Sequence, residues 1–174
     1  TAALWPSPAM ENFCWRIEQQ VGEGGFALAM GEAGTGKSAT LRLLAERLGN
    51  LREVTVGILT RPQASLSDFY RELGALFGVP LAPSNRWASA KLLREKWHHH
   101  LETSLYRPIL LIDEAQEMNL PVFSELRLLA SADLDSRSIL TVILAGDARL
   151  GVKLGTPELL PLASRIRSRF RAEP

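Results

Sequence analysis

Short apolar runs alternate along the chain with longer segments that mix apolar and polar residues. Four of the apolar runs have the length and composition of strands, and they lie at residues 26–30, 53–59, 109–112 and 138–146. The first, "FALAM", is apolar at every position, which is typical of a strand buried on both faces of a sheet. The runs therefore predict a sheet that is covered on both sides.

The segments between these runs carry the periodicity of amphipathic helices. Helices are predicted at residues 10–25, 38–48, 65–80, 84–105 and 120–132, and the tail 156–170 is predicted to form a short helix followed by a fifth strand. Strands that alternate with helices are typical of βα units around a mostly parallel sheet. The sequence therefore predicts a three-layer α/β fold.

The composition is that of one globular domain. The chain has 174 residues, of which 46% are hydrophobic and 22% charged, and its net charge of +1 gives no overall basic field for nucleic acid. The single cysteine, Cys14, cannot form an internal disulfide and favours a reducing, cytoplasmic location. No apolar run approaches the ~20 residues of a membrane span. Because the chain starts at Thr1 and stops at Pro174 within an arginine-rich stretch, we expect a domain from a longer protein.

A glycine-rich segment, "GEAGTGKS", separates the strand at 26–30 from the helix at 38–48. The spacing Gly31-x-x-x-x-Gly36-Lys37-Ser38 satisfies the P-loop pattern, including the strand before it and the helix after it. Glycine lacks a Cβ and tolerates positive φ, so successive backbone N–H groups can converge on an anion. The following helix directs its positive dipole end to the same place. These flanks favour a phosphate cradle over an ordinary glycine-rich turn.

The cradle assigns residues to a nucleotide and to Mg²⁺. Lys37 supplies a mobile positive charge to the β- and γ-phosphates, and the Ser38 hydroxyl is a ligand for Mg²⁺. The residues predicted to bind the nucleotide are Gly31, Glu32, Ala33, Gly34, Thr35, Gly36, Lys37, Ser38 and Ala39.

Two adjacent carboxylates follow the apolar run at 109–112, in the segment "ILLIDEAQ". Asp113 is predicted to hold Mg²⁺, directly or through water, and Glu114 to orient and deprotonate the attacking water. The alternative is an acidic pair that caps the next helix, and the upstream P-loop disfavours it. The letters "DEAQ" also occur in superfamily-2 helicases, but two RecA-like lobes do not fit in this chain.

Four arginines alternate in the tail "ASRIRSRFRA", namely Arg165, Arg167, Arg169 and Arg171. In a helix Arg165 and Arg169 would share a face, whereas in an extended segment all four would share one. One interpretation is a solvated basic edge. The other is an arginine finger supplied to the ATP of a neighbouring subunit, which requires a ring or a filament.

Three further features, most of them within the helix at 84–105, bear on partners. His98, His99 and His100 occupy consecutive positions that point ~100° apart, so they do not converge on a metal ion. Trp87 and Trp97 are predicted to be packing residues, with base stacking as the alternative. A local DNA-binding patch or a solvated helix face is predicted for Arg61, Arg86, Lys91, Arg94 and Lys96.

The chain resembles AAA+ ATPases of the ExeA/GspA type and their transposase-associated, TniB-like relatives. The similarity covers nearly the whole length, through "GGFALAMGEAGTGKS", "LIDEAQEM", "SELRLLASADLDSRSILTVILAGDARL" and "PELLPLASRIRSRF". It implies a parallel five-stranded sheet of order 5-1-4-3-2, an adenine pocket formed by the initial helix around Trp5 to Phe13, and ATP and Mg²⁺ as ligands. It also implies that Arg165 or Arg169 is the arginine that acts on a neighbour.

The resemblance also bears on the residue at the tip of the fourth strand. In such ATPases a polar residue there senses the γ-phosphate, and Asp147 in "GDARL" lies nearest that position. A third carboxylate beside a triphosphate costs Coulomb energy unless an arginine or a metal neutralises it. Asp147 is therefore either a catalytic sensor or a residue that faces the neighbouring loop.

The chain departs from the family in two places, which guide the choice of function. Secretion-type members usually have Gly-Gln-Pro-Glu-Leu where this chain has "GDARL", and the helical lid after the fifth strand is missing, so we expect weak turnover. The "GDARL" variant favours a helper ATPase that assembles with ATP on DNA and regulates a transposase. The alternatives are a secretion-assembly ATPase and a nucleotide-gated switch with little turnover.

Overall fold

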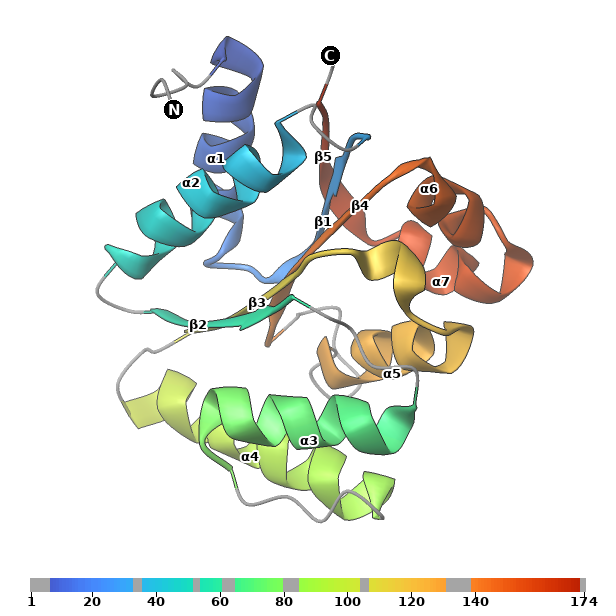
Figure 1. Cartoon of the computed structure of the whole chain (residues 1–174). Helices are drawn as coiled ribbons and strands as arrows, with labels where there is room; N and C mark the ends of the chain where they lie inside the picture. Colours follow the sequence, from blue (N-terminus) through green and yellow to red (C-terminus); the bar gives the residue numbers. More distant parts are fainter. Residues whose placement is uncertain are drawn as a thin grey trace.

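The computed structural model describes residues 7–32, 36–51, 54–60, 65–79, 85–103, 107–130 and 139–172. The strands in these ranges are β1 (Gly25–Met30), β2 (Val54–Leu59), β3 (Arg107–Ile112), β4 (Thr141–Gly146) and β5 (Ile166–Arg171). They form one sheet of order β2-β3-β4-β1-β5, and every neighbouring pair is parallel. Figure 1 shows this sheet crossing the middle of the molecule. The predicted order 5-1-4-3-2 and the parallel arrangement are confirmed.

Helices connect the strands at the predicted places. The helical elements are α1 (Pro8–Gln20), α2 (Lys37–Gly49), α3 (Leu66–Phe77), α4 (Arg86–Thr103), η1 (Ala115–Glu117), α5 (Leu120–Ala130), α6 (Ala148–Leu154), η2 (Pro157–Leu159) and α7 (Leu160–Ala163). The tail therefore forms a short helix followed by a strand, as predicted. The helix α6 was missed, because seven residues directly after a strand are too few to show a clear helical period.

The first helix is shorter than its predicted range of 10–25. It ends at Gln20. Beyond it, Gly24 and Gly25 adopt positive φ values of 75° and 111° and turn the chain into β1. Glycine reaches this backbone region without the steric penalty that a Cβ imposes. The two glycines thus separate the helix from the strand rather than ending the helix themselves.

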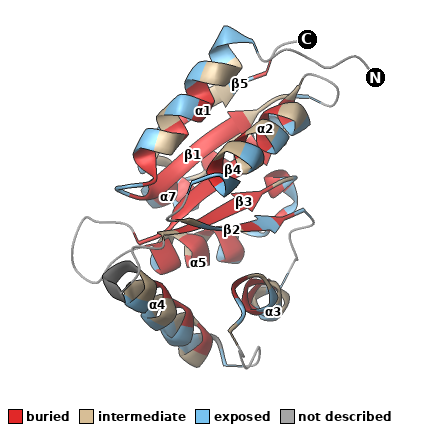
Figure 2. Ribbon diagram, turned by 90° about the vertical axis from the view of Figure 1, so that its left-hand side faces the viewer, coloured by how far each residue is buried: buried red, intermediate tan, exposed pale blue. Residues whose placement is uncertain are grey.

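Two apolar clusters cover the two faces of the sheet. On one face, Ala27 and Ala29 of β1 pack in a cluster with buried residues of α1 and α2, including Phe13 and Leu44. On the other face, Phe26 and Leu28 belong to a larger cluster with α3, α4, α5, α6 and α7. Figure 2 shows α1 and α2 on one side of the buried strands and α3, α4 and α5 on the other. This is the three-layer architecture that an apolar strand such as β1 requires.

The two tryptophans of α4 differ in environment. Trp97 is 2% exposed and packs edge-on against Phe77 at a ring-centroid distance of 5.3 Å. Trp87 is 79% exposed. The prediction of a packing role is confirmed for Trp97 and wrong for Trp87, which lies near the first turn of the helix and on its outer surface.

Candidate functional site

The site lies at the carboxyl-terminal edge of the parallel sheet, where ligands bind in open α/β folds. Strands β1 and β4 end side by side, with Met30 opposite Gly146. The Gly31 backbone N–H donates to the Gly146 carbonyl oxygen (3.1 Å) and continues the pairing by one residue. On the other side, the Asp113 N–H donates to the Leu59 carbonyl oxygen (2.9 Å). The start of the P-loop and the acidic pair are thus held at one edge by the strands that precede them.

The amino terminus of α2 faces this edge without a side-chain cap. Gly36 is the N-cap residue, has a φ of 96° and forms no capping hydrogen bond through a side chain. Its carbonyl oxygen accepts the first helical hydrogen bond, from the N–H of Thr40 (2.9 Å). The backbone amides before Thr40, those of Lys37, Ser38 and Ala39, have no carbonyl within the helix to pair with. This arrangement suits an anion. The predicted cradle residues Ala33, Gly34 and Thr35 lie outside the described residues.

Lys37 and Glu114 meet across the site. The Lys37 Nζ atom lies 3.6 Å from Oε1 of Glu114, and the Lys37 side chain is 7% exposed whereas that of Glu114 is 48% exposed. A buried ammonium group is costly unless an anion accompanies it. At 3.6 Å the two atoms are farther apart than in a normal hydrogen bond, so this ion pair can give way when Lys37 contacts a phosphate.

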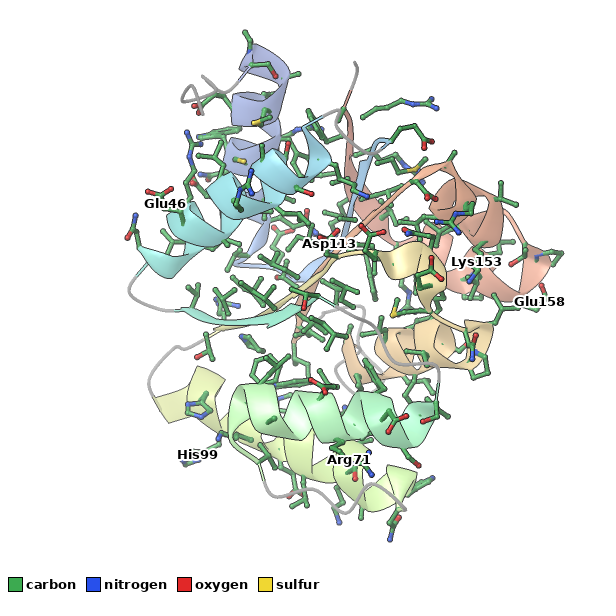
Figure 3. All side chains as sticks on the ribbon, viewed as in Figure 1. Glu46, Arg71, His99, Asp113, Lys153 and Glu158 are labelled. Carbon is green, nitrogen blue, oxygen red and sulfur yellow. The ribbon has the colours of Figure 1, made fainter. Side chains whose placement is uncertain are left out.

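The backbone after β3 turns sharply to present the acidic pair. Glu114 has a φ of 53°, the one positive value among the described non-glycine residues, and such a conformation costs on the order of 1–3 kcal/mol in a residue with a side chain. Its N–H donates to Oδ1 of Asp113 (2.8 Å). Figure 3 shows Asp113 near the centre of the molecule, just past the end of β3. The strand therefore delivers both carboxylates to the edge that faces α2, as predicted.

Glu32 and Ala148 link the P-loop to the loop after β4. The Ala148 backbone N–H lies 3.4 Å from Oε1 of Glu32, a long hydrogen bond. Ala148 is the first residue of α6, so Glu32 contacts the start of that helix through its side chain.

Asp147 has its carboxylate engaged on its own segment. Its side chain accepts from the Arg149 N–H (2.9 Å) as the N-cap of α6, and the Arg149 guanidinium donates through Nε (3.0 Å) and Nη2 (2.7 Å) to Oδ2. The hydrogen bonds from Arg149 hold the pKa of Asp147 below its ordinary value. Arg149 also lies 3.4 Å from Glu117. The Coulomb cost of a third carboxylate at the site is therefore offset by an arginine two residues away.

A residue that the sequence interpretation missed, Gln116, contacts both Glu114 and Asp147. Its side-chain Nε2 donates to Oε2 of Glu114 (2.5 Å), and its Oε1 accepts from the Asp147 N–H (3.3 Å). The residue is 3% exposed. It is the last letter of "DEAQ", and the signal that could have identified it is a neutral polar residue close to two apolar residues, Ala115 and Met118, which the structure buries.

The arginine tail is extended at its end, so the helical arrangement of Arg165 and Arg169 is wrong. Arg165 directly precedes β5, Arg169 is paired in register with Leu28 and Arg171 with Met30. The backbone carbonyl oxygen of Arg169 accepts from the Arg16 guanidinium (3.2 Å). Because β5 is parallel to β1, Arg165 lies at the amino-terminal edge of the sheet, opposite to the P-loop.

Other predicted features lie away from this edge or outside the described residues. Arg61, the side chain of Arg86 and Trp5 of the expected adenine pocket are not among the described parts. Lys96 donates to the carbonyl oxygens of Phe77 (2.7 Å) and Gly78 (3.4 Å). Within the described ranges no group of three or more His, Cys, Asp or Glu side chains is placed to hold a metal ion. None of the described helices has both the length and the apolar composition that crossing a bilayer requires.

The fold and the site define the class of protein. A family model described as "AAA domain" matches residues 18–153, and the chain belongs to this family. Among characterised proteins it is similar to general secretion pathway protein A of Aeromonas hydrophila, with 34% identity over 154 residues. That match covers 87% of this chain but 27% of the relative, so the chain spans about a quarter of that protein's length. The relationship supports the ExeA/GspA type; it does not extend to the TniB-like branch.

Solved structures with the same fold include a Cdc6p and an ORC2 protein. The chain superimposes on Cdc6p from Pyrobaculum aerophilum with a TM-score of 0.70 and 18% identity, covering all of this chain and 48% of that one. The ORC2 protein of Aeropyrum pernix, described with ADPNP and ADP, gives a TM-score of 0.67 at 14% identity and covers 94% of this chain and 46% of ORC2. At these identities the similarity shows the P-loop NTPase fold.

Proposed function

We propose that this domain binds and hydrolyses Mg-ATP. The observation that carries the proposal is the meeting of Lys37 and Glu114 at 3.6 Å, beside the uncapped amino terminus of α2. One residue is suited to bind a terminal phosphate and the other to activate water. Membership of the AAA family supports a nucleotide as the ligand.

The backbone and side chains around α2 would hold the triphosphate. The backbone N–H groups of Gly36, Lys37, Ser38 and Ala39 would donate to the phosphate oxygens. The P-loop spacing predicts that the other cradle residues also bind the phosphates, namely Gly31, Glu32, Ala33, Gly34 and Thr35. The φ of 96° at Gly36 supports this role, because it turns the chain so that the helix begins facing the cradle.

Ser38 and Asp113 are the residues that would hold Mg²⁺. Both offer oxygen ligands, which this small, hard cation prefers, and Mg²⁺ is commonly held by one or two protein oxygens plus phosphate oxygens and water. Asp113 lies at the end of β3 with its Oδ1 accepting from the Glu114 N–H (2.8 Å), which fixes the carboxylate. The donor set therefore fits the ion. When bound, Mg²⁺ would neutralise charge on the phosphates.

Glu114 is the proposed general base. In the structure its Oε1 faces Lys37 and therefore the position of the terminal phosphate. Once Lys37 donates to that phosphate, Oε1 becomes available to accept a proton from water. The ion pair between the two residues is thus exchanged for two productive contacts when nucleotide binds.

Arg165 is proposed to act on a neighbouring subunit, with Arg169 as the alternative. The strand β5 runs from Ile166 to Arg171, and at about 3.3 Å per residue it separates Arg165 from the nucleotide edge of its own sheet by roughly 20 Å. An arginine side chain is much shorter than this, so Arg165 can reach only a nucleotide held by another copy. The proposal implies self-association in the ATP state, as a ring or a filament.

The similarity to general secretion pathway protein A favours a role for this ATPase in the assembly of a secretion system. The role as a helper of a DNA transposase rests on the "GDARL" segment alone and stays a prediction, as do DNA binding and the alternative of a nucleotide-gated switch. Among the solved neighbours, Drosophila ORC is described bound to DNA, with a TM-score of 0.65, 19% identity and coverage of 94% of this chain and 29% of that one. At that identity the neighbour supports only the fold, so DNA binding needs its own measurement.

The test is phosphate release with ATP or GTP, with Mg²⁺ or a chelator, and with or without duplex DNA. Lys37→Ala should weaken triphosphate binding about 100-fold or more, and Glu114→Gln should lower kcat by about 100-fold while leaving binding intact. Matched controls are Arg42→Ala and Glu46→Gln, both on exposed helix positions. Wild-type rates in the two site variants would refute the proposal. Tight binding without release, in both wild type and Glu114→Gln, would favour the switch.

A further inference from the structure

The buried side chain of Gln116 is bonded at both ends of its amide. The Nε2 atom donates to Oε2 of Glu114 (2.5 Å), and Oε1 accepts from the backbone N–H of Asp147 (3.3 Å). With 3% of its surface exposed, the side chain is desolvated, and a buried amide that loses its partners is costly. The two bonds therefore fix the direction of the amide, with its donor end toward Glu114.

The surrounding structure holds Gln116 in this position. Lys153 of α6 donates through Nζ to the carbonyl oxygens of Gln116 (2.5 Å) and Met118 (2.7 Å), which ties the η1 turn to α6. Figure 3 labels Lys153 on α6, next to this turn. Gly146 leaves room for the amide, since a Cβ there would lie 2.5 Å from Oε1 of Gln116. The turn, the tip of β4 and α6 thus form one packed unit around Gln116.

The two carboxylate oxygens of Glu114 have different partners. Oε1 faces Lys37 at 3.6 Å, and Oε2 accepts from Gln116 at 2.5 Å. The Lys37 contact must open for Lys37 to bind a phosphate, whereas nothing in the proposed reaction requires the Gln116 contact to open. The oxygen that becomes available is therefore always Oε1.

We propose that Gln116 is a positioning residue that holds the Glu114 carboxylate through Oε2 and leaves Oε1 as the oxygen that activates water. This inference rests on the proposed function, since Glu114 is its base. An amide suits the task because it donates a hydrogen bond without adding a charge. A second carboxylate at this position would repel Glu114, and an apolar side chain of the same length would leave Glu114 free to rotate.

Two variants and one matched control separate positioning from a structural role. Gln116→Met keeps the length but removes both hydrogen bonds, and Gln116→Glu keeps the volume but removes the neutral donor. Gln20→Met is the control, because Gln20 is also buried and donates to backbone carbonyls of Gly24 (3.5 Å) and Phe26 (3.2 Å) at the opposite edge of the sheet. All three are measured for ATP affinity, kcat, KM and melting temperature.

The positioning role predicts a split between binding and turnover. Both Gln116 variants should lower kcat by about 10- to 100-fold, a part of the roughly 10²–10⁴-fold that a general base contributes. Their ATP affinity and KM should change by less than about twofold. Gln20→Met should lower the melting temperature and leave kcat unchanged. A wild-type kcat in Gln116→Met would overturn the proposal, as would equal losses of kcat in Gln116→Met and Gln20→Met.

A readout without turnover keeps the inference apart from the proposed function. In nucleotide-free protein, the side-chain amide signals of Gln116 in a ¹⁵N–¹H spectrum are identified by their loss in Gln116→Met. Glu114→Ala should move them upfield by removing the acceptor. Unmoved signals would overturn the positioning role even if ATP is hydrolysed. If they move but wild type releases no phosphate, the proposed hydrolysis fails, while the Gln116 contact stands.

Discussion

A Cβ placed on Gly146 would lie 2.5 Å from Oε1 of Gln116, and also 2.9 Å from Cδ2 of Leu150. The last residue of β4 is thus a glycine because the neighbouring turn occupies the space of a side chain. This close approach brings the tip of β4 against the amide that contacts Glu114, which lies just past the end of the neighbouring strand β3. The two strand ends are therefore coupled through direct packing.

Gly146→Ala should disturb this packing. We expect a loss of about 1–3 kcal/mol in the free energy of unfolding, as for other overpacked sites, together with a lower kcat. Denaturant unfolding and phosphate release measure the two effects. Gly49→Ala at the end of α2 is the control, because a Cβ there meets nothing within 4 Å, and it should be neutral or slightly stabilising. Unchanged stability and turnover in Gly146→Ala would contradict the packing described.

Asp147 should stabilise the fold in a pH-dependent manner. Its pKa in the folded state lies below the ordinary value of 3.8 because Arg149 donates to it. A group with a lowered folded pKa contributes stability above its ordinary pKa and loses that contribution as the pH falls through the folded value. Asp147→Ala should therefore lower the melting temperature at neutral pH, through loss of about 1 kcal/mol from the helix cap alone.

The difference between Asp147→Ala and wild type should shrink as the pH is lowered toward and below 3.8. Glu158→Ala, at an exposed position of η2, is the matched control. It should have little effect on the melting temperature, both at neutral pH and at acidic pH. A melting-temperature difference that is constant with pH would mean that the charge of Asp147 is not what stabilises α6.

Cys14 should be unreactive while the protein is folded. Burial raises the pKa of its thiol to about 11, and the side chain is fully buried, so the reactive thiolate is scarce at neutral pH. A thiol reagent such as iodoacetamide should modify Cys14 only as the protein unfolds, at a rate that rises with denaturant. If native protein were modified as fast as the unfolded chain, the prediction that burial protects Cys14 would be wrong.

Arg165→Ala should impair turnover without weakening ATP binding. An arginine supplied to a phosphoryl-transfer site contributes roughly 10³–10⁵-fold, so we expect a loss of at least about 100-fold. Arg169→Ala tests the alternative residue. Arg167→Ala is the control, since Arg167 pairs with Glu23 of its own chain at 2.5 Å.

Mixing variants tests action between subunits. Protein with Arg165→Ala retains an intact P-loop, and protein with Lys37→Ala retains Arg165, so a mixture should recover activity that neither has alone. Recovery would support self-association with a shared site. A mixture as inactive as its parts, under conditions where the copies associate, would place Arg165 outside the reaction.

The sequence predicted the fold well where each element carried its own signal. Apolar strands such as 26–30 and the P-loop spacing are local features, and Lys37, Asp113 and Glu114 follow directly from them. Together with the resemblance to a family, they were sufficient for the strand order and for the edge of the sheet that carries the site.

The contacts of Gln116 and Asp147 could not be predicted in the same way. Both depend on how closely η1 approaches the tip of β4 and α6, and Gln116 and Asp147 are 31 residues apart in the sequence. No periodicity encodes that distance. In the sequence, this close approach is reflected only in the polarity of Gln116 and in the glycine at position 146. Neither residue can be interpreted in this way until the strands are placed side by side.

The most direct measurement of the central claim is a crystal structure of the Glu114→Gln variant with ATP and Mg²⁺. The account predicts the triphosphate at the amino terminus of α2, Lys37 Nζ on a terminal phosphate oxygen, and the ion near Ser38 and Asp113. A nucleotide bound elsewhere, or Lys37 still paired with position 114 beside an occupied site, would contradict it.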